Sequence, residues 1–295
     1  MIDPHPTRPA ALAEFLATLD LTDTGARTHE DIFTGSSQQM PHGRVFGGQV
    51  LAQTVMAAQR TVAADRIIHS MHGYFLRPGD PALPITFAVD RIHDGRSFTA
   101  RRTQAYQNGV PIFSMIASFQ LETTGVEHQQ QMPAGIPGPE DLPGGTNLRP
   151  IGTHPLTLNP LLLVSPFEFR VVPELPSRPG DSPYDAIWIK AVGRLPDDPH
   201  LHRAALAYAS DYTLLASAMH LHGLTLSEKP GLKAASLDHV MWWHRFARAD
   251  EWMLFLQASP NTGGGRGLGQ GRVYDESGRL LASVGQEGMI RVPAD

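Results

Sequence analysis

Four short anchors occur twice in this chain of 295 residues, in the same order and at nearly the same spacing. The second member of each pair follows the first by 169 or 170 positions. The pairs are His69 and His239, Gly95 and Gly265, Gly109 and Gly278, and Ser114 and Ser283. One anchor alone carries little weight, but four in order with one residue of drift predict that a single structural unit is used twice.

The elements expected from hydrophobic spacing support the repeat. In the first copy, helices are expected from about Pro9 and after Gly48, followed by strands at 67–76, 85–92, 98–107 and 111–121. In the second copy, strands at 166–172 and 186–192 precede a long helix over 204–221 and strands at 235–245, 251–259, 267–274 and 280–292. Each unit is then a helix that an antiparallel sheet can wrap, which is an α+β architecture.

The stretch between the two copies has a different composition. Residues 123–160 are dense in proline and glycine and show no hydrophobic period. Such a segment is typical of a linker that runs over the surface. We therefore predict a first unit over residues 1–122, a linker over 123–160 and a second unit over 161–295.

Composition and charge narrow the classes of protein. The net charge is −5 and the chain has no cysteine, so a general nucleic-acid binder, disulfides and thiolate metal sites are not expected. No apolar run is long enough for a membrane span and the first residues do not resemble a secretory signal, so we expect a soluble, cytoplasmic protein. Arg96, Arg101 and Arg102 are candidates to hold a phosphorylated small molecule; a solvated strand face is an equally good interpretation.

Asp211 is the only formal charge in the helix predicted over 204–221. Because surface helices carry charges on their outer face, a lone carboxylate in a neutral helix is expected to be at least partly buried. A buried carboxylate must be hydrogen-bonded or have a raised pKa, and both conditions are common where a base is needed. A purely structural aspartate remains the alternative.

Two further polar residues draw attention. Strand alternation places Gln286 on the apolar face, where an amide can hold a water molecule or a carbonyl group, although a core glutamine bonded to backbone would give the same pattern. Ser236 opens a predicted strand, and the chain has no G-x-S-x-G motif that would make it a nucleophile.

Gly47 and Gly48, just before a helix, either present N–H groups to an anion or carbonyl or allow close packing. No histidine spacing predicts a metal site.

Several longer motifs resemble the acyl-CoA thioesterase II family. In the first half they are RVFGGQVLAQ at 44–53 and DGRSFTARR at 94–102, where the family leaves the seventh position variable. In the second half they are ASD at 209–211, SLDHVMW at 236–242 and QEG at 286–288. The resemblance covers nearly the whole chain outside the linker. It implies a double hot-dog fold, in which an antiparallel sheet wraps a long helix, twice.

The resemblance also implies the chemistry. The family's catalytic trio carries over to Asp211, Ser236 and Gln286, which would activate a water molecule that hydrolyses acyl-CoA to free fatty acid and CoA, with no metal ion and no cofactor. Serine in place of the threonine found in some members keeps the hydroxyl group. The resemblance also makes a homodimer or higher homo-oligomer an expectation.

The first copy lacks this trio. Ala117 stands where Gln286 does in the second copy, Arg66 stands near the place of Ser236, and Gln49 stands roughly in the place of Asp211. We therefore expect the first unit to be a structural copy that completes the pocket wall.

Two alternatives stay open. A hot-dog hydratase or dehydratase acting on acyl-CoA usually pairs an aspartate with a histidine a few residues along the same helix, and here the first histidine after Asp211 is His220. A module that binds acyl-CoA without catalysis is the other alternative, because a fold does not determine a function. Acyl chain length does not follow from the sequence.

Overall fold

The structure is a computed structural model that describes residues 8–27, 29–142, 162, 165–173, 175, 185–224 and 231–293. The helices are α1 (Arg8–Leu19), α2 (Gly47–Gln59), α3 (Pro199–Ser210) and α4 (Leu214–His220), with a 3-10 turn, η1, at Pro139–Asp141. The strands of the first half are β1 (Thr22–Arg27), β2 (Glu30–Gly35), β3 (Arg66–Phe75), β4 (Ile85–Asp94), β5 (Phe98–Gln107) and β6 (Val110–Leu121). Those of the second half are β7 (Phe167–Val172), β8 (Asp185–Ala191), β9 (Lys233–Ser236), β10 (Asp238–Trp243), β11 (Met253–Gly263), β12 (Arg266–Asp275) and β13 (Leu280–Arg291).

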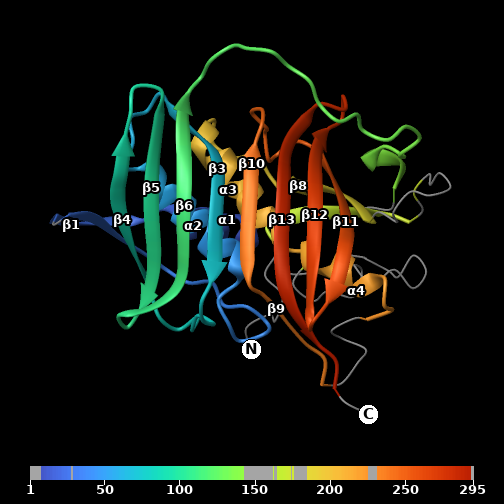
Figure 1. The fold of residues 1–295 in the computed structure, drawn as a ribbon, viewed down its shortest axis with the longest axis horizontal. Coiled ribbons are helices and arrows are strands. Elements are labelled where there is room, and N and C mark those ends of the chain that lie inside the picture. The colour runs from blue at the N-terminus through green and yellow to red at the C-terminus, as the bar shows by residue number, and fades with distance from the viewer. Residues whose placement is uncertain are drawn as a thin grey trace.

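The strands of the described residues form one 13-stranded sheet that is symmetric in its order (Figure 1). The order is β1-β2-β4-β5-β6-β3-β10-β13-β12-β11-β8-β7, and β9 pairs with β13 beside this path. The two halves of this order mirror each other across the antiparallel pair β3–β10. In that pair Met71 lies opposite Met241, and these two residues are 170 positions apart. The duplication predicted from the sequence is therefore present in the strand order.

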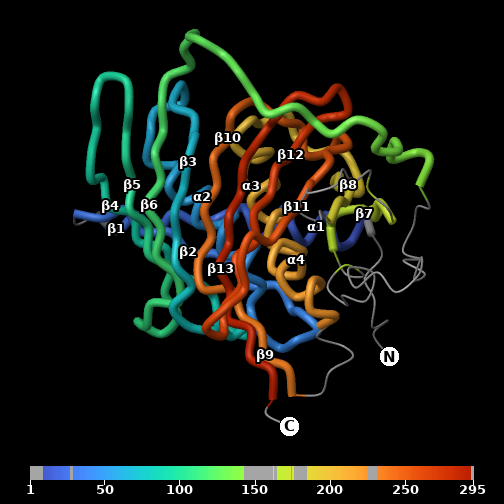
Figure 2. Tube along the Cα trace, turned by 45° about the vertical axis from the view of Figure 1, so that its right-hand side comes forward, coloured from blue at the N-terminus to red at the C-terminus, as the bar shows by residue number. Residues whose placement is uncertain are grey.

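The long helices lie together on one side of the sheet (Figure 2). α2 and α3 pack against each other there, and the main hydrophobic core combines their buried side chains with those of both halves of the sheet. Gly48 permits the close approach of these helices, because a Cβ atom at this position would lie 2.4 Å from the carbonyl oxygen of Tyr208. The packing of one half's helix on the other's joins the two units through a shared core.

The helix predicted over 204–221 is wrong in two respects. It begins earlier, at Pro199, because Asp198 caps it by accepting a hydrogen bond from the N–H of His200, and proline is favoured in a first turn. It is also broken: α3 ends at Ser210, residues 211–213 form a turn, and α4 begins at Leu214. α3 packs on α2, whereas α4 packs on β11, β12 and β13. The sequence has no glycine or proline that signals this break.

Most predicted strands are present, with three corrections. β1 and β2 were not expected, because these short segments are largely polar. The strand predicted over 235–245 divides at Leu237, so that β9 pairs with β13 alone and β10 pairs with both β13 and β3. Regular alternation over 280–292 predicts that Leu280 shares a face with Ala282, but a bulge at Leu281 turns Leu280 toward a second hydrophobic cluster on the opposite face. The strands predicted at 98–107 and 111–121 are joined by a tight hairpin, with positive φ at Asn108 and Gly109.

The described part of the predicted linker crosses from β6 to the second half along the top of Figure 1. It is held there by Gln129, whose Nε2 donates to the carbonyl oxygen of Gly278 over 2.8 Å, and by Trp188, whose Nε1 donates to that of Pro137 over 3.0 Å. The residues beyond Leu142 up to 160 lie outside the described residues, and the boundaries of the two units stay predictions. None of the helices in the described ranges is long and apolar enough to cross a membrane.

Candidate active site

The three predicted site residues meet at one point. The side-chain nitrogen Nε2 of Gln286 donates to Asp211 Oδ1 over 2.6 Å and to Ser236 Oγ over 2.8 Å. An amide nitrogen carries two protons, so a single group holds the carboxylate and the hydroxyl together. The three residues come from parts of the second half that are far apart in the sequence.

Each residue is positioned by a different element. Asp211 is the C-cap residue of α3 and stands at the break before α4. Gln286 is on β13 with its side chain on the buried face and only 1% exposed, as the strand alternation predicted. Ser236 ends β9 and lies opposite Gly288, two residues beyond Gln286, so both side chains fall on the same face of the sheet.

The first half contributes backbone to this site. The N–H of Gly48, in the first turn of α2, donates to the carboxylate of Asp211. A Cβ atom at Gly47 would lie 2.6 Å from Asp211 Oδ2, so only glycine leaves room for the carboxylate. The glycine pair therefore permits close packing and presents one N–H group, that of Gly48, to an anion. The sequence pattern contained this signal but did not show that the anion is the protein's own aspartate.

The surroundings raise the pKa of Asp211 from its ordinary value to about 7. Loss of solvation on burial is the largest cause, and it is opposed by the hydrogen bonds from Gln286 and from the N–H of Gly48. A carboxyl group with a pKa near neutrality is both a useful proton acceptor and a useful proton donor at physiological pH. The expectation of an at least partly buried carboxylate is confirmed.

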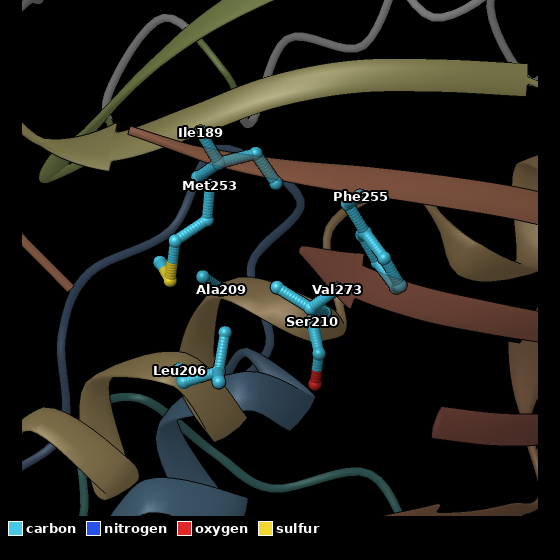
Figure 3. Close-up of a pocket in the computed structure, with 7 residues that line it drawn as sticks. All are labelled: Ile189, Leu206, Ala209, Ser210, Met253, Phe255 and Val273. Carbon is cyan, nitrogen blue, oxygen red and sulfur yellow. The ribbon is translucent and has the colours of Figure 1, made fainter. Parts of the chain in front are cut away.

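An apolar cavity of about 10 Å³ borders Ser210, the residue before Asp211, and lies between α3 and strands β8, β11 and β12 (Figure 3). Its lining is Ile189, Leu206, Ala209, Ser210, Met253, Phe255 and Val273. This volume is close to what one water molecule needs, and Ser210 is the one polar residue in the lining.

The arginines considered for a phosphate do not form a cluster. Arg101 is 1% exposed and its guanidinium bonds within the fold, to the hydroxyl and carbonyl of Thr61, to the carbonyls of His93 and Ala100, and to Asp94. Arg102, the next residue on β5, points to the other face and pairs with Asp90 over 3.0 Å. Strand alternation separates the two side chains, so Arg101 and Arg102 do not form a phosphate site together.

The counterparts in the first half carry no similar trio. Ala117 lies opposite Met71 in the first half, just as Val284 lies opposite Met241 in the second. Ala117 is therefore the counterpart of Val284. Two residues further along each strand, Phe119 is the counterpart of Gln286. The assignment of Ala117 from sequence spacing is off by two residues. Arg66, the counterpart of Ser236, donates to the carbonyls of Gly95 and Arg96. The mirrored position therefore lacks both the amide and the hydroxyl.

Comparison with known proteins identifies the family. Residues 165–289 match the family model for acyl-CoA thioesterase, and residues 36–120 match that for the acyl-CoA thioesterase N-terminal domain. The chain belongs to the acyl-CoA thioesterase family.

Several relatives can be named. Human acyl-coenzyme A thioesterase 8 is 38% identical over 89% of this chain and 85% of its own, and acyl-CoA thioesterase 2 of Haemophilus influenzae is 36% identical over 88% and 92%. The solved structure of an acyl-CoA thioesterase II, TesB2, from Mycobacterium marinum is 41% identical, covers 95% of this chain and 98% of its own, and has a TM-score of 0.78.

A likeness at lower identity bears on the fold alone. A protein of unknown function from Alicyclobacillus acidocaldarius, described as having a hot-dog fold, is 17% identical with a TM-score of 0.75 over 95% of this chain. The fold is thus the double hot-dog that the resemblance implied. It departs from the expectation in the second unit, where the central helix is broken.

Proposed function

We propose that this protein hydrolyses acyl-CoA thioesters to a free fatty acid and CoA, with Asp211 as the general base and Ser236 and Gln286 as the groups that orient it and the water. The observation that carries the proposal is the pair of hydrogen bonds from one Gln286 nitrogen to the carboxylate and the hydroxyl. Relatives that cover most of the chain are named as acyl-CoA thioesterases, which supports the same substrate class.

The proposed reaction begins with a water molecule beside the carboxylate. Asp211 removes a proton as the water oxygen bonds to the thioester carbonyl carbon, which gives a tetrahedral intermediate. Because Ser236 Oγ accepts the hydrogen bond from Gln286, its own proton is directed away from that amide and is available to the water or to the substrate oxygen. The intermediate then collapses, the carbon–sulfur bond breaks, and the proton on Asp211 passes to the thiolate of CoA.

The developing negative charge on the carbonyl oxygen needs a partner. Both protons of the Gln286 amide are used by Asp211 and Ser236, so this amide is poorly placed to serve as that partner. The N-terminal turn of α2 lies against Asp211, and the N–H groups of a helix start favour an anion. We therefore assign the stabilisation of the oxyanion to this turn, which comes from the first half.

The two alternatives fit less well. A hydratase or dehydratase site would require a histidine working with Asp211, but Nδ1 of His220 pairs with Asp185 over 2.8 Å. The relatives with 36–41% identity are named as thioesterases, which disfavours a binding protein without catalysis. A cytoplasmic location and a homodimer or higher homo-oligomer remain predictions, which cell fractionation and light scattering would test.

A panel of acyl-CoAs of increasing chain length, scored by release of free thiol, tests the function directly. We expect turnover of at least part of the panel. Turnover should depend on Asp211, as set out in the Discussion. Binding of acyl-CoA without thiol release over hours would contradict the proposal and would favour the binding module.

A further inference from the structure

Two buried hydrogen bonds flank Asp211 in the sequence. On the N-terminal side, Ser210 Oγ lies 3.0 Å from Nε2 of His239. On the C-terminal side, Thr213 Oγ1 accepts a hydrogen bond of 2.8 Å from Nε2 of Gln257. All four of these residues are buried, and His239 and Gln257 are 0% exposed. The helix break that carries Asp211 is therefore tied to β10 on one side and to β11 on the other.

The direction of the first bond follows from the protons available. Ser210 Oγ donates its single proton to the carbonyl oxygen of Ala207 over 2.8 Å, so it must accept from His239. His239 thus carries its proton on Nε2. Burial lowers the pKa of His239 to about 3, which keeps the ring neutral, and its Nδ1 has no hydrogen-bond partner within the described residues. A neutral ring bonded to Ser210 is arranged to hold a position and not to exchange protons with Asp211.

The second bond, from Gln257 to Thr213, replaces the helix cap that Thr213 would otherwise provide. Thr213 is the N-cap of α4, where a threonine hydroxyl commonly accepts a bond from a backbone N–H of the first turn. Here its side chain makes no such cap, and its oxygen faces Gln257 instead. The bond to the sheet takes the place of the local cap.

These bonds explain a break that the local sequence does not favour. Residues 204–221 are rich in alanine and leucine and contain neither glycine nor proline, so their propensity favours one continuous helix. Apart from Ser210 itself, every residue that lines the cavity is apolar (Figure 3). The cavity therefore offers the Ser210 hydroxyl no competing hydrogen-bond partner. The partners that fix residues 210 and 213 come from the sheet.

We infer that His239 and Gln257 are positioning residues, which hold the helix break so that the Asp211 carboxylate meets Gly48 and Gln286 together. This inference rests on the proposed role of Asp211 as base. A displacement of about 1 Å in a reacting group can lower a rate by roughly a hundredfold, so loss of either bond should act on turnover. Ser210 and Thr213 are the acceptors of the two hydrogen bonds and are part of the same arrangement.

The central test removes one hydroxyl with little change of shape. We expect Thr213→Val to lower kcat at least fivefold with KM within twofold of wild type, and Thr213→Ser, which keeps the hydroxyl, to recover most of the rate. Thr103→Val is the matched control: Thr103 is also 0% exposed, lies on β5 of the first half, and makes no side-chain hydrogen bond among the described residues. Its kcat should stay within twofold of wild type.

A second pair of variants tests the other bond. His239→Gln places an amide donor near the position of Nε2, whereas His239→Leu removes the donor. We expect kcat to be at least fivefold higher in the glutamine variant than in the leucine variant. If the leucine variant does not fold, the Thr213 series still decides the matter.

A double variant separates positioning from a general loss of packing. If Thr213 acts through Asp211, adding Thr213→Val to Asp211→Asn should leave the residual single-turnover rate unchanged. A further fivefold fall would overturn the inference, as would Thr213→Val with wild-type kcat. Those results leave the proposed function intact provided that Asp211→Asn alone is slow, whereas a fast Asp211→Asn enzyme would show that the proposed base itself is wrong.

Discussion

The backbone N–H of Gly48 donates to the carboxylate of Asp211, although Gly48 lies in the first turn of a helix of the first half and Asp211 caps the end of a helix of the second. The start of a helix favours a nearby negative charge by about 0.3–1 kcal/mol, through its unpaired N–H groups and the dipole. The half that lacks the trio therefore supports the ionised form of the proposed base. The candidate site is built by both halves of the chain.

Replacing Asp211 tests the base directly. Asp211→Ala, and separately Gln286→Ala, should lower thiol release from acyl-CoA at least tenfold, because general base catalysis typically contributes roughly 10²–10⁴. Circular dichroism should show that both variants keep the fold. Near wild-type turnover of Asp211→Ala would rule out its assigned role.

The pKa of Asp211 predicts a pH profile. The base must be ionised to accept a proton, and its pKa is about 7. We therefore expect kcat/KM to rise about tenfold per pH unit below 7 and to level off above it. Initial rates of thiol release from pH 5.5 to 8.5 would measure this. The prediction is wrong if the rate is flat over that range or if Asp211→Asn shows the same slope.

The same carboxyl group should reduce stability as the pH rises. Its pKa is about 7 in the folded protein and about 3.9 in an unfolded chain. Between these values the folded state holds a proton that the unfolded state has released, so stability falls as the pH increases from 4 to 7. Asp211→Asn removes this dependence. The free energy of unfolding of the variant minus that of wild type should therefore be larger at pH 8 than at pH 5. Urea unfolding at both pH values checks it; an equal difference at the two values would contradict it.

Gly47 should be intolerant of a side chain. A Cβ atom there would lie 2.6 Å from Asp211 Oδ2 and 3.1 Å from the ring of Phe75. We expect Gly47→Ala to lower kcat at least tenfold by displacing the carboxylate. Gly125→Ala, at an exposed position where a Cβ would meet nothing within 4 Å, is a suitable control and should stay near wild type. Equal rates for the two variants would show that Asp211 can move without cost.

Arg101 should matter for folding and not for substrate. Removing this guanidinium leaves its buried acceptors without a donor, which costs about 1–3 kcal/mol, and all of its partners lie within the first half. Arg101→Met should lower the free energy of unfolding accordingly, while KM for acyl-CoA stays unchanged at a temperature where the variant is folded. A raised KM with unchanged stability would restore Arg101 as a phosphate ligand.

The fold could be predicted from the sequence because the main signals of this fold in the sequence are periodic. The repeated anchors, the strand alternation and the apolar faces of the first helices all report side chains that alternate between core and solvent. β1 and β2 were not predicted because both are short and largely polar, so the alternate burial of β2 has no matching hydrophobic alternation in its sequence. The break after Ser210 was not predicted because the residues that bond to its two sides, His239 and Gln257, come from distant strands. The helix sequence itself carries no signal of these bonds.

The site was predicted in part for the same reasons. Asp211 and Gln286 each conflict with their apolar surroundings, and such a conflict can be seen in a single segment. Ser236 has no local signal and was found through the resemblance. The role of Gly48 combines a helix start in one half with a carboxylate in the other, and only the tertiary structure brings them together.

The central pairing of Met71 with Met241 has an evolutionary consequence. The two halves meet as two identical chains would across a two-fold axis, and in such a dimer every substitution appears at both mirrored positions. A single polypeptide removes that constraint. One helix is free to diverge toward glycines that leave room for a neighbouring carboxylate and offer it an N–H group, while the other diverges toward an acid. The fused chain can therefore specialise its halves in ways that no symmetric assembly of identical chains can inherit.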